Sequence, residues 1–312
     1  MLTSMTVREP VPSSVLYRFL SSKALVRRRA TIALGFGGAR QMAIRIVQSK
    51  QNTRVKELRA TLLRPGRGDA ESVALEGIHL LAEAIRSGVE IETVFVAQGN
   101  ENLLEELGIS DSVEVLALPQ EILASAVTTE NPQPIAALAR TRHWRWPDLL
   151  PQPHRNALIV ILAGIQDPGN LGTILRSAEA FGANGVVCLP GTVSPWNAKA
   201  MRASAGSVFR LPWIWESASR SFEVLGEAGI VTLAAMAHDA QPAGAYNLAQ
   251  PVALVIGAEG SGLAPELAAQ CAARITIPCP GPVESLNAAV AASVLLYEAS
   301  RQRTQVKSRR QA

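Results

Sequence analysis

The sequence predicts an α/β protein with two domains, on the basis of its length, its composition and a repeated alternation of short apolar segments with amphipathic ones. The chain has 312 residues, which corresponds to about two domains of ordinary size. Hydrophobic residues make up 48% of the chain and charged residues 18%, a composition typical of a folded protein with sizeable cores.

The first domain is predicted over residues 43–139. Helices are expected at 56–63, 76–87, 101–107 and 120–126, and strands at 73–75, 92–96 and 112–117. The first of these helices should end at the Pro/Gly turn 64–68. This alternation indicates a compact α/β sandwich. Residues 140–156 contain three prolines and two tryptophans and are expected to be a linker.

The second domain is predicted over residues 157–303. Strands are expected at 157–163, 185–189, 207–211, 230–235, 252–256 and 274–277, and helices at 170–181, 217–228, 263–272 and 283–302. This alternation indicates a mostly parallel sheet covered by helices on both faces. The general rule that protein chains do not thread through themselves argues against a knot.

Basic residues are concentrated at the two ends of the chain. Residues 1–41 hold seven Lys or Arg and one acid, and residues 301–312 hold five bases and no acid. The remainder is acidic, so the net charge of +4 does not by itself indicate nucleic-acid binding. Residues 1–41 are interpreted as a disordered extension, a targeting segment or sequence upstream of a start at Met42, and residues 304–312 as a basic tail.

One internal segment is also strongly basic. Between Arg45 and Arg67 the chain carries seven bases and only one acid, Glu57. Two interpretations are open for it: a solvated helix face, or a patch that contacts RNA phosphates through Arg54, Lys56 and Arg59.

Several classes of protein are not indicated. The apolar segments are far shorter than the ~18 residues that a membrane helix needs, so no membrane partner is expected. The three cysteines and four histidines show no ligand spacing, so neither a disulfide scaffold nor a metal site is expected. A reducing, cytoplasmic location follows from the same cysteine usage.

Three segments at predicted strand-to-helix junctions carry polar residues suited to chemistry. In the segment 164–176, Asn170 is expected to be the N-cap of a helix whose free amides suit an anion such as an RNA phosphate. Arg176 should lie over Gly172, which would leave its guanidinium uncovered. The alternative for Arg176 is an ordinary surface pair with Glu179, three residues later.

The other two segments are rich in glycine and proline. In 252–263 a buried strand ends in three glycines around Glu259, which favours close approach of backbone to a ligand, although a tight connection explains it equally well. It lacks the Lys-Ser/Thr pair of a phosphate-binding loop, so NTP hydrolysis is not indicated. In 275–287, Ser285 and Asn287 stand at a helix start, where they could cap the helix or meet a ligand.

In order and spacing, these three segments resemble motifs one, two and three of the SpoU (TrmH-type) branch of the SPOUT RNA methyltransferases, over about residues 157 to 300. Residues 194–206 resemble the RNA-facing segment of that family through Asn197, Lys199, Arg202 and Ser204. Residues 51–77 are similar to the substrate-binding domain often attached in front, a ribosomal-protein-like sandwich that holds RNA.

The resemblance implies a trefoil-knotted catalytic domain, a homodimer, and methyl transfer from S-adenosylmethionine to a ribose 2′-hydroxyl, in rRNA more than in tRNA. The implied cofactor contacts are Gly257, Ile277 and Leu286, the implied catalytic residues are Asn170, Arg176, Glu259, Ser285 and Asn287, and the implied RNA contacts in this domain are Lys199 and Arg202. Because a guanidinium keeps its proton in proteins, we expect Arg176 to grip a phosphate and stabilise the developing alkoxide rather than act as a base.

Two other readings compete with the enzyme. A catalytically inactive RNA-binding protein on the same fold would be favoured by the loss of Arg176, Glu259 or Asn287, and all three are present. A dinucleotide-dependent enzyme would need a GxGxxG turn between strand and helix, which the second half lacks. One departure from the family pattern is the pair Pro280 and Pro282 in the third motif, which stiffens that turn.

Overall fold

The computed structural model describes residues 43–64, 72–129, 131–150, 157–282 and 285–311. The predicted extension 1–41, the turn at 65–68 and the end of the predicted linker at 151–156 lie outside these residues. Residues 42–312 form one compact unit, which contains both predicted domains.

The N-terminal domain is built on a five-stranded mixed sheet. Its strands are β1 (Ile44–Ile46), β2 (Ser72–Glu76), β3 (Ile91–Ala97), β4 (Glu114–Leu118) and β5 (Ile135–Arg140), in the order β1-β4-β3-β5-β2. Strands β1, β4 and β3 run parallel, whereas β5 is antiparallel to both β3 and β2.

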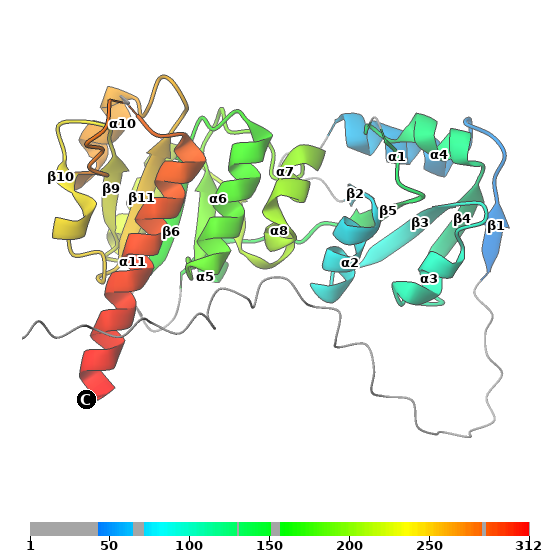
Figure 1. Ribbon diagram of the computed structural model, residues 1–312, viewed down its shortest axis with the longest axis horizontal. Helices are drawn as coiled ribbons and strands as arrows, with labels where there is room; N and C mark the ends of the chain where they lie inside the picture. The colour runs from blue at the N-terminus through cyan, green and yellow to red at the C-terminus, as the bar shows by residue number, and fades with distance from the viewer. Residues whose placement is uncertain (1–42, 65–71, 130, 151–156, 283–284, 312) are drawn as a thin grey trace, which may run out of the picture. The chain divides into compact units, whose positions relative to one another are not determined.

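Helices cover both faces of this sheet (Figure 1). They are α1 (Thr53–Leu63), α2 (Ile78–Arg86), α3 (Asn102–Glu106) and α4 (Gln120–Ala126). The apolar side chains of α1 and α4 pack with Phe95 and Leu116 on one face, and those of α2 and α3 pack with Val94 and Val115 on the other. Adjacent residues of one strand therefore enter opposite cores, as the pleat of a strand requires.

Two strands of this domain are not predicted by the sequence. Strand β5 has the sequence Ile-Ala-Ala-Leu-Ala-Arg, and alanine has little intrinsic preference for strands. It forms because it lies between β2 and β3, where five of its six side chains are buried. Strand β1 has only three residues, all exposed at the sheet edge, so its apolar pattern is too short to read.

The C-terminal domain is built on a seven-stranded, entirely parallel sheet, as the alternation of elements predicts. Its strands are β6 (Leu158–Ala163), β7 (Gly185–Cys188), β8 (Trp213–Trp215), β9 (Val231–Ala235), β10 (Gln241–Pro242), β11 (Val252–Gly257) and β12 (Ala273–Thr276), in the order β10-β12-β9-β11-β6-β7-β8. Strands β6, β9, β11 and β12 are neighbours, so their carboxyl ends meet at one edge of the sheet.

Helices cover both faces of this sheet as well. They are α5 (Trp146–Leu149), α6 (Pro168–Ala180), α7 (Ala198–Ser204), α8 (Ser207–Arg210), α9 (Ala218–Glu227), α10 (Pro265–Gln270) and α11 (Ala288–Gln311), with a short 3-10 turn at Ala243–Ala245. Helices α6, α7, α8 and α11 pack on one face, and α5, α9 and α10 on the other. Helix α11 lies beside α6, and the start of α11 is close to the first motif (Figure 1).

The prediction of one strand in this domain is wrong, and helices extend into the segments predicted as linker and tail. The segment 207–211 is not a strand: Ser207–Arg210 forms helix α8, and the strand follows at Trp213–Trp215. A short apolar run does not distinguish a buried helix turn from a buried strand. The last helix begins at Ala288 and continues to Gln311, so the predicted tail 304–312 is, where described, part of helix α11 of the C-terminal domain. The predicted linker contains helix α5, whose Leu149 is fully buried.

Among the described residues, no helix is long and apolar enough to cross a membrane.

Candidate active site

A cavity of about 630 Å³ opens where the carboxyl ends of β9, β11 and β12 meet the start of α11. It is lined by residues 235–239 after β9, 256–263 at the end of β11, 274–279 around the end of β12, and Ser285, Leu286 and Ala288. A volume in this range suits a cofactor-sized ligand. All three predicted cofactor contacts, Gly257, Ile277 and Leu286, line this cavity, together with Glu259 and Ser285.

The side chain of Asn287 joins the three motifs at the rim of the cavity. Its Nδ2 donates to Oδ1 of Asn170 and to Oε1 of Glu259, each at 3.2 Å. Its Oδ1 accepts from the backbone N–H groups of Ala289 and Val290 in the first turn of α11. One amide therefore caps a helix and holds two neighbouring strand ends together, which explains why this position carries an asparagine.

Asn170 is placed differently from the prediction. The N-cap of α6 is Asp167, whose Oδ1 accepts from the backbone N–H of Asn170 at 2.9 Å, so the prediction of Asn170 as the cap is wrong. If Asn170 were the N-cap, its side-chain oxygen would accept a hydrogen bond from a backbone N–H of the helix. Because Asp167 takes that role, the oxygen of Asn170 is available to Asn287.

Lys199 is paired with the same aspartate. Its ammonium lies 2.9 Å from Oδ2 of Asp167. This hydrogen bond, with that from the backbone N–H of Asn170, holds the pKa of Asp167 below its ordinary value. Lys199 therefore stands directly beside the first turn of α6. The expected free amides are not found there, because Pro168 has no N–H and Asp167 accepts from the backbone N–H groups of Asn170 and Leu171.

Arg176 is exposed on α6, two turns after the start of the helix. Within the part of the chain that the structure describes, its guanidinium makes no ion pair. The alternative pairing with Glu179 does not occur, because Glu179 accepts from Arg210 instead. The role predicted for Gly172 is wrong: this residue is buried against α7, where an added Cβ would lie 2.3 Å from the carbonyl oxygen of Ala200.

The glycine at position 257 is required by the packing of its own loop. An added Cβ there would lie 2.3 Å from both the carbonyl carbon of Gly262 and the backbone nitrogen of Leu263. Gly260 and Gly262 adopt positive φ values of 79° and 66°, which favour glycine. The loop 257–263 therefore folds back tightly on itself, as the interpretation of a tight connection expects, and its residues also line the cavity.

The residues predicted to contact RNA fall into two groups. Lys56, Arg59 and Arg202 are exposed, whereas Arg54 pairs with Glu57 at 2.8 Å and with Glu114 at 3.0 Å. Arg54 thus holds α1 to β4, and its charge is largely offset.

Two other members of the 194–206 segment have structural roles. Asn197 caps α7 by accepting from the backbone N–H of Lys199, and the buried hydroxyl of Ser204 donates to the carbonyl of Met201.

The sequence did not indicate the loop after β9, which supplies Met236, His238 and Asp239 to the cavity. The loop reaches the cavity because β9 lies next to β11 in the folded sheet. This neighbourhood is a property of the strand order and leaves no local pattern in the sequence. Among the described residues, no group of three or more His, Cys, Asp or Glu side chains could hold a metal ion.

Comparison with known proteins agrees with this geometry. Residues 157–297 match the SpoU rRNA Methylase family, and residues 52–137 match the MRM3-like substrate binding domain. The chain is 34% identical over 262 residues to an uncharacterised tRNA/rRNA methyltransferase of Synechocystis, covering 82% of this chain and 93% of that protein. It is 28% identical to the 23S rRNA (guanosine(2553)-2′-O)-methyltransferase RlmP of Bacillus subtilis, covering 80% of this chain and 97% of that protein.

A solved structure shares the same architecture. The SpoU methyltransferase AviRb from Streptomyces viridochromogenes, in complex with AdoMet, superposes with a TM-score of 0.73 at 28% identity, covering 81% of this chain and 99% of that one. The fold and the site thus define an RNA-modifying enzyme with a separate substrate-binding domain. The chain belongs to the SpoU rRNA methylase family and is an RNA methyltransferase, which confirms the family and the activity inferred from its motifs.

Proposed function

We propose that this enzyme transfers the methyl group of S-adenosylmethionine to a ribose 2′-hydroxyl of ribosomal RNA. The observation that carries the proposal is the position of Asn287, which ties Asn170 and Glu259 together at the rim of a cofactor-sized cavity. The alternative of a catalytically inactive RNA-binding protein is not supported, because the relatives are named as methyltransferases and the polar rim is intact.

The cavity fits the cofactor of the family in its chemistry. Backbone around Gly257 and Ile277 and the half-buried side chain of Leu286 line it, which suits a ligand with an apolar adenine ring and polar edges. S-adenosylmethionine, when bound, supplies the electrophilic methyl group on its sulfonium. Glu259 and Ser285 lie at the same cavity and would orient the reacting groups.

Asn170 and Arg176 both lie on α6, and Asn170 is joined to the cavity rim through Asn287. We infer that the exposed guanidinium of Arg176 binds the phosphate adjacent to the target ribose and stabilises the alkoxide that develops on its oxygen. The guanidinium does not act as a base, because it keeps its proton. The 2′-hydroxyl proton passes to solvent water as the new O–CH₃ bond forms and the methyl–sulfur bond breaks. Placing the 2′-hydroxyl correctly next to the methyl donor supplies most of the remaining rate acceleration.

RNA is held by both domains in this proposal. The exposed Lys56 and Arg59 on α1 contact phosphates from the N-terminal domain, and Lys199 and Arg202 contact them beside α6. Ribosomal RNA is favoured over tRNA because the family model and the Bacillus relative both name rRNA.

The direct test is to map ribose methylation. Ribosomal and transfer RNA from a strain lacking the gene should lose one 2′-O-methylated nucleotide, and the purified protein with S-adenosylmethionine should restore it on the unmodified rRNA. Methyl transfer to a base nitrogen or carbon instead of a ribose would overturn the proposed reaction, and restoration on tRNA alone would overturn the proposed substrate.

We propose that the protein forms a homodimer through an apolar surface on helix α11. Val290, Val294 and Tyr297 of α11 are 48%, 39% and 55% exposed, and they line a shallow groove with Thr173 and Phe181. Residues three or four apart form one helix face, and a continuous exposed apolar face of this kind marks an association site. A second copy of this chain is the occupant that family membership favours.

The oligomeric state tests this surface. Val294→Glu should convert the dimer to a monomer in sedimentation, because a carboxylate would be buried against an apolar partner. Leu63→Glu, at an equally apolar but separate position that is 62% exposed, is the matched control and should leave the dimer intact. A monomeric wild-type protein would exclude the proposal.

We also infer that the catalytic domain has the trefoil knot of its family. The support is that the segment after β12 returns to contact helix α6, which follows β6, and the loop that follows β11, through Asn287.

A further inference from the structure

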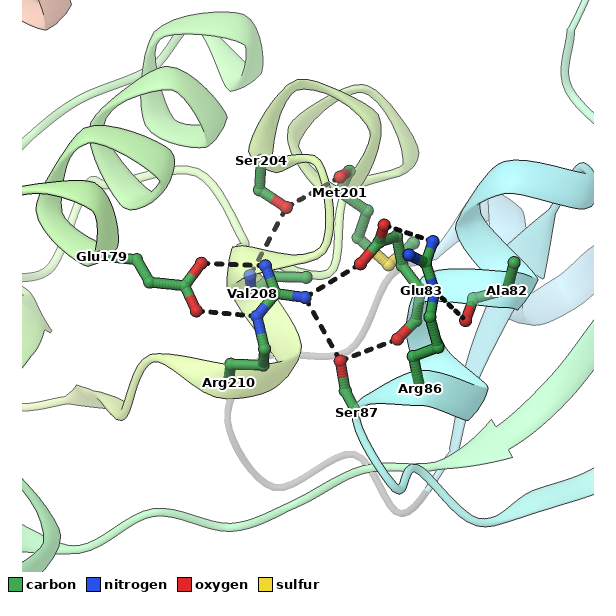
Figure 2. A network of polar contacts seen from close by, with 9 residues as sticks. All are labelled: Ala82, Glu83, Arg86, Ser87, Glu179, Met201, Ser204, Val208 and Arg210. Carbon is green, nitrogen blue, oxygen red and sulfur yellow. Dashed lines mark hydrogen bonds and ion pairs between the residues drawn. The ribbon is translucent and has the colours of Figure 1, made fainter. Parts of the chain in front are cut away.

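Arg210 lies at a contact between the N-terminal domain and the catalytic domain. It is the last residue of α8, and its Nε and NH2 donate to the two carboxylate oxygens of Glu179 on α6 at 2.7 and 2.9 Å. Its NH1 donates to Oε2 of Glu83 at 2.9 Å and to the hydroxyl of Ser87 at 3.3 Å, both from α2 or its C-terminal end. Figure 2 shows the guanidinium between the two carboxylates.

The backbone just before α8 places Arg210 for this contact. Ala205 and Gly206 adopt positive φ values of 48° and 86°, so the chain turns sharply between α7 and α8. An added Cβ at Gly206 would lie 2.9 Å from the Cβ of Glu83, which cannot swing aside, so a larger residue would crowd α2. The carboxylates hold the pKa of Arg210 above its ordinary value, with the hydrogen bond to Glu179 as the largest cause.

A single exposed ion pair contributes little to stability, but this one differs in two respects. The contact to Glu179 is a two-pronged guanidinium–carboxylate pair, the geometry in which such pairs are strongest. The side chains of Glu83, Glu179 and Arg210 are only 26%, 32% and 37% exposed, so solvent screens them incompletely.

The partner on the catalytic side is also significant. Glu179 is on α6, three residues after Arg176, and α6 begins beside Asn170. The N-terminal domain is therefore held, through one arginine, by the helix that carries the proposed phosphate-binding residue. The two domains also share apolar packing, because buried residues of both belong to one hydrophobic cluster and α7 contacts β2. The bonds of Arg210 add fixed directions to this contact, which apolar packing alone does not supply.

We propose that Arg210 is a positioning residue: by linking Glu83 of the N-terminal domain to Glu179 of α6, it fixes the RNA held by the first domain relative to the ribose-methylating site of the second. The inference rests on the proposed function for its role with RNA, although the link itself is a property of the protein alone. Without the link, RNA still binds to the basic residues but reaches Arg176 and the cofactor in many orientations.

The test compares Glu83→Gln with Arg86→Gln. Arg86 binds the same carboxylate at 2.6 Å from within α2, so its variant removes a charge pair at Glu83 without touching the link between domains. Glu83→Gln should lower the single-turnover methylation rate at saturating RNA by about 10-fold, because misplaced reactants react slowly. Its affinities for RNA and S-adenosylmethionine should change less than about twofold, and Arg86→Gln should resemble the wild type in all three measurements.

A second measurement does not depend on methylation. In the protein without RNA, amide hydrogen exchange in α2 and α8 should increase in Glu83→Gln and Arg210→Gln, and not in Arg86→Gln. Amide exchange in the double variant Glu83→Gln/Arg210→Gln should be no faster than in Arg210→Gln, because the two substitutions remove the same interaction between the domains. Equal exchange in α8 for Glu83→Gln and Arg86→Gln, or equal single-turnover rates in an active enzyme, would overturn the proposal; a wild-type protein inactive on RNA would count against the proposed function alone.

Discussion

Glu179 accepts both of its short hydrogen bonds from Arg210 and none from Arg176, although Arg176 stands only three residues away on the same helix. The two oxygens of the carboxylate receive Nε and NH2 of Arg210, so the nearest acid on α6 is already occupied. This arrangement leaves the Arg176 guanidinium exposed and available for an external anion.

Arg176→Ala should lower the single-turnover rate of methylation by about 100-fold or more, the usual effect of removing a group that stabilises a developing oxyanion. Arg176→Lys should also be slow, since an ammonium cannot make a two-pronged phosphate contact. Calorimetry should show unchanged S-adenosylmethionine affinity in both variants. Arg220→Ala, which removes the exposed pair with Glu223 on α9, is the control and should keep full activity. Near-normal rates in Arg176→Ala would contradict the proposed role.

Asn287→Asp separates the two functions of this side chain. Aspartate caps a helix as well as asparagine, so the free energy of unfolding should stay within about 0.5 kcal/mol, whereas Asn287→Ala should lose about 1 kcal/mol. The carboxylate cannot donate to Asn170 or Glu259 and repels the latter, so cofactor affinity should fall. Lowering the pH should partly restore that affinity, because a protonated carboxyl can donate again. Calorimetry at two pH values tests this, and an affinity loss independent of pH would argue against the charge repulsion.

Lys56→Glu/Arg59→Glu should weaken RNA binding and flatten its salt dependence. Each lost phosphate contact changes the log–log slope by about 0.7 on single-stranded sites, so the slope should become shallower by about 1.4. Arg54→Gln should instead lower stability with little change in slope, because Arg54 is held by Glu57 and Glu114. RNA affinity over a salt series, beside a cofactor titration, measures both. Coincident slopes for the wild type and the double variant would identify this stretch as a solvated helix face.

Bound cofactor should protect Cys279 from alkylation. Cys279 is exposed and lines the cavity, whereas burial raises the pKa of Cys188 to about 12 and that of Cys271 to about 11. Since only the thiolate reacts, iodoacetamide at neutral pH should label Cys279 first. S-adenosylmethionine should slow that labelling several-fold, as read by peptide mass spectrometry. Labelling of Cys279 that is unaffected by saturating cofactor would place the cofactor elsewhere.

The Glu179–Arg210 pair should contribute stability at neutral pH that disappears in acid. The hydrogen bond from Arg210 lowers the pKa of Glu179 below its ordinary value of 4.5. A carboxyl whose pKa is lowered on folding stabilises the native state above the unfolded pKa, and this stabilisation is lost as the pH falls through the folded value. Urea unfolding should therefore separate the wild type from Glu179→Gln at pH 7, and the two should converge well below pH 4.5. If the difference in unfolding free energy between the wild type and Glu179→Gln did not change with pH, the charge of Glu179 would not be involved.

The sequence by itself determined the parts of this protein that depend on local pattern. The parallel second sheet follows from apolar strands such as 158–163 and 252–257 alternating with helices, and the enzyme family follows from three short motifs at strand ends. The predicted cofactor contacts Gly257, Ile277 and Leu286 line one cavity for the same reason, since parallel strands end at a common edge.

Only the tertiary structure decided what depends on neighbours distant in the chain. Strand β5 forms because two strands enclose it, and glycine is required at positions 172 and 257 by the packing of α7 and of the 257–263 loop. Asp167 rather than Asn170 caps α6, which leaves Asn170 to Asn287, 117 residues later. Arg210 reaches Glu83 across 127 residues. A one-dimensional pattern records which residues are apolar or charged, but the partner of a polar group is set by packing, because a buried or half-buried donor can bond only to an acceptor that the fold brings within reach.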